Sequence, residues 1–489
     1  MDLRIACAAL MLVAMAPSAL AQTAVEPPDP ATVTIPDLSG GRDPAVVSNG
    51  WKYFYFWRAD TSYAEAYADI ADCYRFMPAP NATASVPRFV PWEEAASVAT
   101  VQPSVIQPYG IVGAVIGEII AGPLVRRAHQ SRLRRCMEPR GYQRYPLQER
   151  RWELLTDNFL TRLDRNAGKG GVGPAARWRP AAGGPLMLLA LLATLSASAP
   201  ATVQTPAAPQ PMLVEISEGQ PVTIRQDRAY LLFRMHRPKG VPSFEPVFLR
   251  KPTSAELEDY RTARAKAFEE ARPKLIEERE KALRRRAEQE SQGRKPSGPI
   301  PPEPTLDTFT YFYPAVANLA GIRHNFPLAK GTPDNLYLIE AIPGDYVLYG
   351  TSWGMGPQGL AVCWCLGTVG FTAKAGTVSD LGTMFFDTAK FRSKIPELKD
   401  ETGFGPSSDT PWFLIGGTVR PDRRDGTLPA ALSGISVSPA EYFAVGSFVD
   451  LNNGGVNRLG PVPGVLDYVR GKPIDIKSGA PARGGATGR

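Results

Sequence analysis

The chain has 489 residues, of which 44% are hydrophobic and 21% charged, a balance typical of a globular protein and not of a wholly disordered one. The formal net charge is only +7, and the basic residues are scattered or lie beside acidic ones, so the composition argues against a nucleic-acid partner. The 48 prolines and 45 glycines indicate many turns and linkers, which suits β-rich structure.

Residues 1–21 have the anatomy of a secretory signal peptide. The apolar run at 5–16 follows Arg4 and is shorter than the roughly 20 residues that a membrane span needs. Ala19-Leu20-Ala21 then has the small-x-small pattern that signal peptidase reads. We therefore expect an exported protein of the periplasm or cell envelope, with an uncleaved N-terminal anchor as the alternative.

Signal cleavage would leave four of the five cysteines: Cys73, Cys136, Cys363 and Cys365. An even count in an oxidising compartment favours disulfides, and Cys73 with Cys136 is the natural long-range pair. On a strand both sulfurs of Cys363-Trp364-Cys365 point to one face, where a bond between them would be strained and easily reduced. Two hypotheses stay open for that pair: a redox or metal-binding site, or two small buried apolar side chains.

Residues 22–150 are predicted to form a small helical module. The aromatic run at 51–57 indicates a strand or an extended arm. Asp60 or Ser62 is a candidate N-cap for the helix that follows, and Cys73 lies on that helix.

Glycines punctuate an apolar stretch at 109–125, where Gly113, Gly117 and Ala121 form a small-xxx-small ladder that lets helices approach closely. The stretch resembles the glycine-zipper segments of small bacterial envelope proteins. This resemblance implies membrane insertion or self-association, with the arginines that follow at 126–135 lying at a lipid headgroup surface. Glu118 opposes insertion, and the alternative is a helix packed tightly on the Cys73 helix.

Residues 151–210 are predicted to be a linker that holds a second apolar segment at 185–201. Arg177 and Arg179, a leucine-rich run and a tail of small residues repeat the anatomy of a signal sequence inside the chain. Three explanations are open. Two secretory proteins have been joined, or the segment is a transmembrane helix that leaves the C-terminal half in the cytoplasm, or it is a hydrophobic linker.

From Met212 onward the hydrophobic period changes to two, which indicates short strands separated by glycine and proline turns. The expected strands are 246–249, 308–313, 336–341, 346–349, 362–371, 378–386 and 442–448. We therefore predict an α+β multidomain chain, in which the small helical module precedes a mainly antiparallel β-sandwich at 211–470. Residues 471–489 are predicted to be a disordered tail.

A charged helical insertion is predicted within the sandwich at 253–294. Thr253 and Glu256 form a capping box, and Pro273 is expected to kink or split the helix. The apolar stripe is thin, which favours a solvated helical hairpin; a partner-binding coiled coil is the alternative.

The run Ile342-Pro343-Gly344-Asp345-Tyr346-Val347, followed by Ala375-Gly376-Thr377-Val378, resembles a family of bacterial envelope domains of unknown function. The resemblance implies a transthyretin-like sandwich and no catalysis.

Two short motifs typical of enzymes lack the residues or elements that they need for catalysis. Gly350-Thr351-Ser352-Trp353-Gly354 matches a nucleophile elbow, but all three histidines precede Ser352, and the G-x-G-x-x-G at 354–359 lacks a following helix.

The sequence therefore predicts a non-enzymatic, exported cell-envelope protein with no catalytic, cofactor or metal residues. Its sandwich would be a surface or partner-binding domain for an unknown protein. The helical module would contact a membrane or self-associate through 109–125, and the segment at 185–201 is a candidate anchor. The alternative is a periplasmic thiol redox or metal-binding protein that uses Cys363 and Cys365.

Overall fold

The computed structural model describes residues 37–50, 53–76, 89–94, 132–152, 211–237, 244–294, 300–301, 303–306, 309, 311–331, 333–352, 360–387, 395–398, 416–449 and 455–487. The predicted signal peptide, the glycine-spaced segment with Gly113, Gly117 and Ala121, and the apolar segment at 185–201 lie outside these residues, as does the loop at 353–359.

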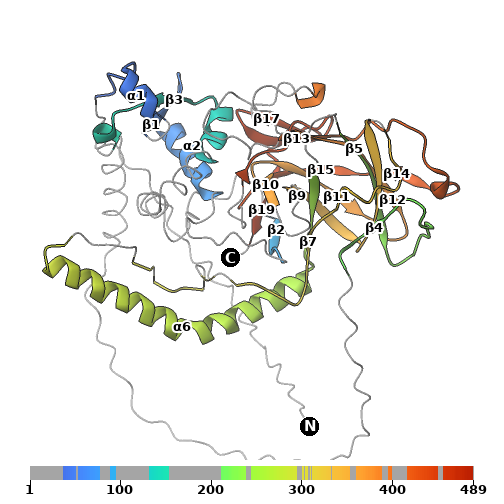
Figure 1. The fold of residues 1–489 in the computed structure, drawn as a ribbon, viewed down its shortest axis with the longest axis horizontal. Coiled ribbons are helices and arrows are strands. Elements are labelled where there is room, and N and C mark those ends of the chain that lie inside the picture. Colours follow the sequence, from blue (N-terminus) through green and yellow to red (C-terminus); the bar gives the residue numbers. More distant parts are fainter. Residues whose placement is uncertain are drawn as a thin grey trace, which may run out of the picture.

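Two packed sheets form the body of the molecule (Figure 1). The nine-stranded sheet has the order β16-β10-β9-β11-β15-β19-β2, with β6 on β9 and β7 on β6. Its strands are β2 (Trp92–Glu94), β6 (Glu245–Arg250), β7 (Leu319–Gly321), β9 (Gly344–Ser352), β10 (Leu360–Cys363), β11 (Thr368–Ala373), β15 (Tyr442–Phe448), β16 (Gly455–Val456) and β19 (Arg483–Thr487).

The six-stranded sheet has the order β13-β12-β5-β8-β4, with β14 on β12. Its strands are β4 (Leu213–Ile216), β5 (Ala229–His236), β8 (Asp334–Ala341), β12 (Val378–Asp387), β13 (Gly416–Arg420) and β14 (Val437–Pro439). Most neighbouring strands are antiparallel, as between β5 and β8, although β12 runs parallel to β5. The mainly antiparallel sandwich behind a small N-terminal module confirms the predicted α+β fold class.

Successive side chains of each strand alternate between the two faces of the nine-stranded sheet, so each face carries its own buried layer. In β9, Tyr346 and Leu348 face the core between the sheets, whereas Val347 and Tyr349 face the other side. Phe233 of β5 stacks on Tyr337 within its own sheet, with ring centroids 5.5 Å apart. The second layer is covered by the N-terminal module, which therefore forms a third tier on the nine-stranded sheet.

The N-terminal module consists of α1 (Pro44–Asn49), β1 (Phe54–Trp57), α2 (Tyr63–Arg75), a helical turn at 132–137, η2 (Glu138–Arg140) and β3 (Gln143–Pro146). Strands β1 and β3 form a two-stranded antiparallel sheet. The backbone N–H of Glu65 donates to the Ser62 hydroxyl at 3.2 Å, so Ser62 caps α2. Asp60 instead lies in the preceding turn, with φ of 54°.

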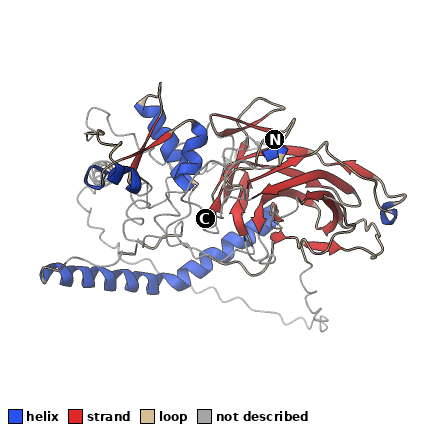
Figure 2. Ribbon diagram, turned by 45° about the horizontal axis from the view of Figure 1, so that its top comes forward, coloured by secondary structure: helices blue, strands red, loops and turns tan. Residues whose placement is uncertain are grey.

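The charged insertion is one long helix, α6 (Ser254–Ser291), which begins at the predicted capping box of Thr253 and Glu256. Pro273 lies inside it, and the helix curves without breaking (Figure 1). Tyr260, Arg264 and Phe268 are buried near its start, whereas most of its later side chains are exposed. Figure 2 shows α6 extending away from the strands.

An extended chain returns beside α6, so the insertion differs from the predicted helical hairpin. Arg264 donates to the carbonyl oxygen of Phe309 at 3.2 Å, and Arg279 to that of Pro301 at 2.6 Å. Within the predicted strand at 308–313, residues 311–313 are extended but unpaired, and Tyr313 packs on Tyr260.

Two further predictions differ from the structure. The expected strand at 362–371 is divided into β10 and β11 by a turn at Gly367, whose φ of 137° favours glycine. The expected tail at 471–489 contains β18 (Lys472–Asp475), paired with β17 (Leu466–Val469), and β19. Strand β19 has no apolar periodicity that would predict it, and glycine is required at 485, where a Cβ would meet the Trp92 ring at 2.1 Å.

Candidate functional site

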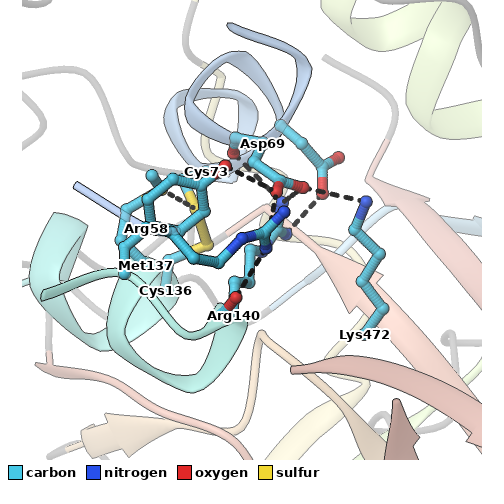
Figure 3. The surroundings of a disulfide bond; sticks show 9 residues. Arg58, Asp69, Cys73, Cys136, Met137, Arg140 and Lys472 are labelled. Carbon is cyan, nitrogen blue, oxygen red and sulfur yellow. Dashed lines mark hydrogen bonds and ion pairs between the residues drawn. A yellow bond between two sulfur atoms is a disulfide. The ribbon is translucent and has the colours of Figure 1, made fainter. Parts of the chain in front are cut away.

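The interface between the N-terminal module and the sandwich contains both cysteine pairs. The structure joins Cys73 of α2 to Cys136 of the turn at 132–137, with Cα atoms 5.7 Å apart (Figure 3). Both residues are buried, and the Cys73 sulfur lies 3.5 Å from that of Met137. This disulfide fixes the two helical pieces of the module to each other.

The second disulfide joins Cys363, the final residue of β10, to Cys365 in the turn that follows. Both side chains are fully buried and face the module, whereas Trp364 between them faces the core of the sandwich. The four cysteines among the described residues therefore lie in one buried layer. Neither sulfur of the Cys363–Cys365 pair is open to solvent.

A buried ion network lies beside the first disulfide and links the module to β18 (Figure 3). The Asp69 carboxylate on α2 lies 3.1 Å from the Arg140 guanidinium and 2.9 Å from the Lys472 ammonium. The Tyr142 hydroxyl donates to the same carboxylate at 3.0 Å, and Arg58 lies 3.6 Å away. Because Asp69 and Arg140 are both almost fully buried, each compensates the charge of the other.

The network changes the protonation of its members. Burial would raise the pKa of Asp69, but Lys472 and Arg140 outweigh it and hold that pKa below its usual 3.8. Burial and the nearby Asp69 charge raise the pKa of Tyr142 to about 12. Asp69 is therefore a carboxylate and Tyr142 a neutral hydroxyl at neutral pH.

The same interface buries three neighbouring arginines. Arg132, Arg134 and Arg135 belong to the turn at 132–137 and are 8%, 7% and 9% exposed. Arg134 forms an ion pair with Glu138 at 3.3 Å. Arg135 reaches the sandwich, where it donates to the carbonyl oxygen of Val456 in β16 at 3.5 Å. The glycine-zipper resemblance implied a lipid headgroup surface for these arginines; the structure buries all three side chains, with Arg135 against the edge strand β16.

Main-chain contacts complete the interface. The Asn318 side chain accepts from the N–H of Val90 at 2.7 Å and donates to the carbonyl oxygen of Val90 at 2.9 Å. Strand β2, which lies between α2 and the turn at 132–137 in the chain, pairs antiparallel with β19 within the nine-stranded sheet. These segments are far apart in sequence, and no local pattern identified the contacts.

A separate polar cluster surrounds Ser352, the serine of the nucleophile-elbow motif. Its hydroxyl donates to the Glu245 carboxylate at 3.0 Å, and the other oxygen of that carboxylate lies 2.7 Å from Nδ1 of His324. The carboxylate thus lies between serine and histidine, whereas a hydrolytic triad has the imidazole in the middle to take the serine proton. Ser352 is also buried, at the last position of β9.

Neither a metal site nor a membrane span is found in the described ranges. No group of three or more His, Cys, Asp or Glu side chains there could hold a metal ion. None of the helices in that part of the chain is both long and apolar enough to cross a bilayer. Comparison with protein-family models, with curated proteins and with solved structures gives no match.

Proposed function

We propose that this chain is an exported, disulfide-cross-linked protein of the cell envelope, without enzymatic activity, whose sandwich is a surface or partner-binding domain. The observation that carries the proposal is the buried layer shared by the module and the sandwich, in which both cysteine pairs are oxidised. Disulfides of this kind persist in oxidising compartments. The signal-like sequence at 1–21 supports the same location.

The shared layer also bears on the segment at 185–201. A membrane cannot separate two parts of a chain that pack on one another and pair their strands, as β2 and β19 do. This packing supports one compartment for both halves and disfavours a transmembrane helix that leaves only the C-terminal half in the cytoplasm. A linker, or a segment that is cut after folding, remains compatible with the packing.

The burial of Cys363 and Cys365 supports a structural role over a redox one. Thiol–disulfide exchange needs an attacking thiolate to reach a sulfur atom. Both side chains have no exposed surface, so a partner could reach them only after the N-terminal module had moved away.

Reporter fusions test the shared compartment. A periplasm-active reporter would be fused after residue 160 in one gene and after residue 489 in another, with matched fusions that lack residues 2–21 as controls. We expect activity from both fusions and from neither control. Activity from the residue-160 fusion alone would place 185–201 across the membrane and contradict the proposal.

Thiol counting tests the oxidation state. The purified protein would be denatured and alkylated before and after reduction, and its mass measured. We expect no alkylated thiol before reduction and four afterwards, because signal cleavage removes Cys7 from the five cysteines. Alkylation without reductant would refute the disulfides.

A further inference from the structure

Arg135 is a buried cation with an incomplete set of partners. It is 9% exposed, and its one hydrogen bond among the described residues is the 3.5 Å contact with the carbonyl oxygen of Val456. A guanidinium carries several N–H donors, and burying a charge without a partner is costly. Arg140, which is buried to a similar degree, has the carboxylates of Asp69 and Asp72 as partners.

The surroundings of Arg135 add positive charge. Arg132 precedes it by one helical turn, and Arg134 is its neighbour in sequence. Among the described residues, the carboxylate that attracts the charge of Arg135 is that of Glu138, and it already forms an ion pair with Arg134 at 3.3 Å. Burial and the charges of Arg134 and Arg132 together lower the pKa of Arg135 to about 9, although Glu138 opposes them. Arg135 therefore remains charged at neutral pH, in a positive potential.

We propose that Arg135, with Arg132 and Arg134 beside it, binds a phosphate-class oxyanion where the N-terminal module meets β16. The planar guanidinium of Arg135 presents paired donors that match two oxygens of a phosphate, and the charges of Arg132 and Arg134 add a positive potential that attracts a multiply charged anion. The Cys73–Cys136 disulfide holds the turn in place, so the arginines are positioned before the anion arrives. The proposed site is argued from the packing of these residues and not from the cellular compartment proposed above.

Thermal unfolding of the full-length mature protein tests the site. Phosphate would be titrated against chloride at constant ionic strength, for the wild type and for Arg135→Met. An anion that binds only the folded state raises the unfolding midpoint in proportion to the logarithm of its concentration. We expect this rise in the wild type, a weaker rise in Arg135→Lys, and none in Arg135→Met.

Two controls separate binding from misfolding. Arg286→Met changes an exposed arginine of α6 and should keep the full phosphate effect. In phosphate-free buffer, Arg135→Met should unfold at the same temperature as the wild type or above it, because it removes a poorly compensated buried charge. An equal phosphate effect on the unfolding midpoint of the wild type and of Arg135→Met would overturn the proposal. A wild type that shows neither a phosphate effect nor binding to phosphatidylglycerol vesicles would overturn it too.

The phosphate could be a free ion or the headgroup of a lipid, and vesicle binding distinguishes these sources. Co-sedimentation with phosphatidylglycerol vesicles, but not with phosphatidylcholine vesicles, that is lost in Arg135→Met and inhibited by free phosphate would identify a headgroup. A phosphate-dependent midpoint without vesicle binding would identify a free phosphate. Vesicle binding that Arg135→Met leaves unchanged, with no phosphate effect on the midpoint, would contradict the site.

Discussion

At the scale of single residues, Asp69 has three charged neighbours in the interface. Its carboxylate contacts the side chains of Arg140, Lys472, Tyr142 and Arg58 from three parts of the chain. A buried ion pair adds little net stability by itself, but removing one partner leaves the other charge buried and uncompensated. Asp69 therefore compensates the buried charges of Arg140 and Arg58 in the interface.

Asp69→Asn should destabilise the protein by about 3–5 kcal/mol, because the amide keeps the shape of the side chain and removes its charge. Urea unfolding would measure the loss. Asp227→Asn, which breaks the exposed pair of Asp227 with Arg225, is the matched control and should change stability little. Equal effects of the two substitutions would show that the Asp69 network contributes nothing specific.

The same network predicts loss of stability in acid. Because the folded-state pKa of Asp69 lies below its usual 3.8, the ionised carboxylate stabilises the protein above that value. This contribution should disappear as the pH falls from about 4 through the folded-state pKa. Unfolding measured across this range should show a shallower pH dependence for Asp69→Asn than for the wild type, and parallel curves would contradict the assignment.

At the scale of elements, α6 is attached to the body by its first part. Phe268 packs on Phe309 with ring centroids 5.5 Å apart, and Tyr260 packs on Phe89 and Tyr313. Beyond Pro273 the helix is held mainly by pairs within itself, such as Lys281 with Glu277. Exposed pairs of this kind each contribute only a few tenths of a kcal/mol.

Phe268→Ala should therefore detach α6, with a loss of about 3 kcal/mol at this contact, since a buried aromatic ring is replaced by a cavity. Hydrogen exchange of the α6 amides would report the change, and the sandwich strands should keep their protection. Ile276→Ala removes a side chain of the same helix that is 39% exposed, and should leave the exchange pattern unchanged. Equal effects of the two substitutions would count against the packing described.

The elements that the sequence predicted well are those set by local chemistry. The capping box of Thr253 and Glu256 requires residues three positions apart, and the apolar run expected as a strand at 336–341 belongs to β8, which is buried on both faces. The contacts of Asp69 with Lys472 and of Arg135 with Val456 join residues hundreds of positions apart. In the sequence such arginines and lysines resemble ordinary surface charges, so the interface could not be predicted.

At the scale of the whole molecule, three layers are held together by packing, and both disulfides lie between the second and third. Cys73 and Cys136 are 63 positions apart, whereas Cys363 and Cys365 are separated by two. A cross-link that closes a longer loop restricts the unfolded chain more strongly.

Replacing Cys73 and Cys136 together by alanine should cost about 4 kcal/mol in the entropic model. The matched control is the double replacement of Cys363 and Cys365, which removes the same atoms from the same layer but closes a far smaller loop. Thermal unfolding should show the larger loss for the first pair. Equal losses would mean that local packing, and not the cross-link, stabilises the interface.

The position of β19 between β15 and β2 also determines when the nine-stranded sheet can be completed during synthesis. Strand β2 is translated about 390 residues before its hydrogen-bonding partner, since Glu94 pairs with Gly485. This edge of the nine-stranded sheet therefore stays open until the intervening chain has been synthesised. Folds dominated by such distant pairings form slowly. A chain that cannot close this edge early stays unfolded for longer, and an unfolded chain is what the export proposed above requires.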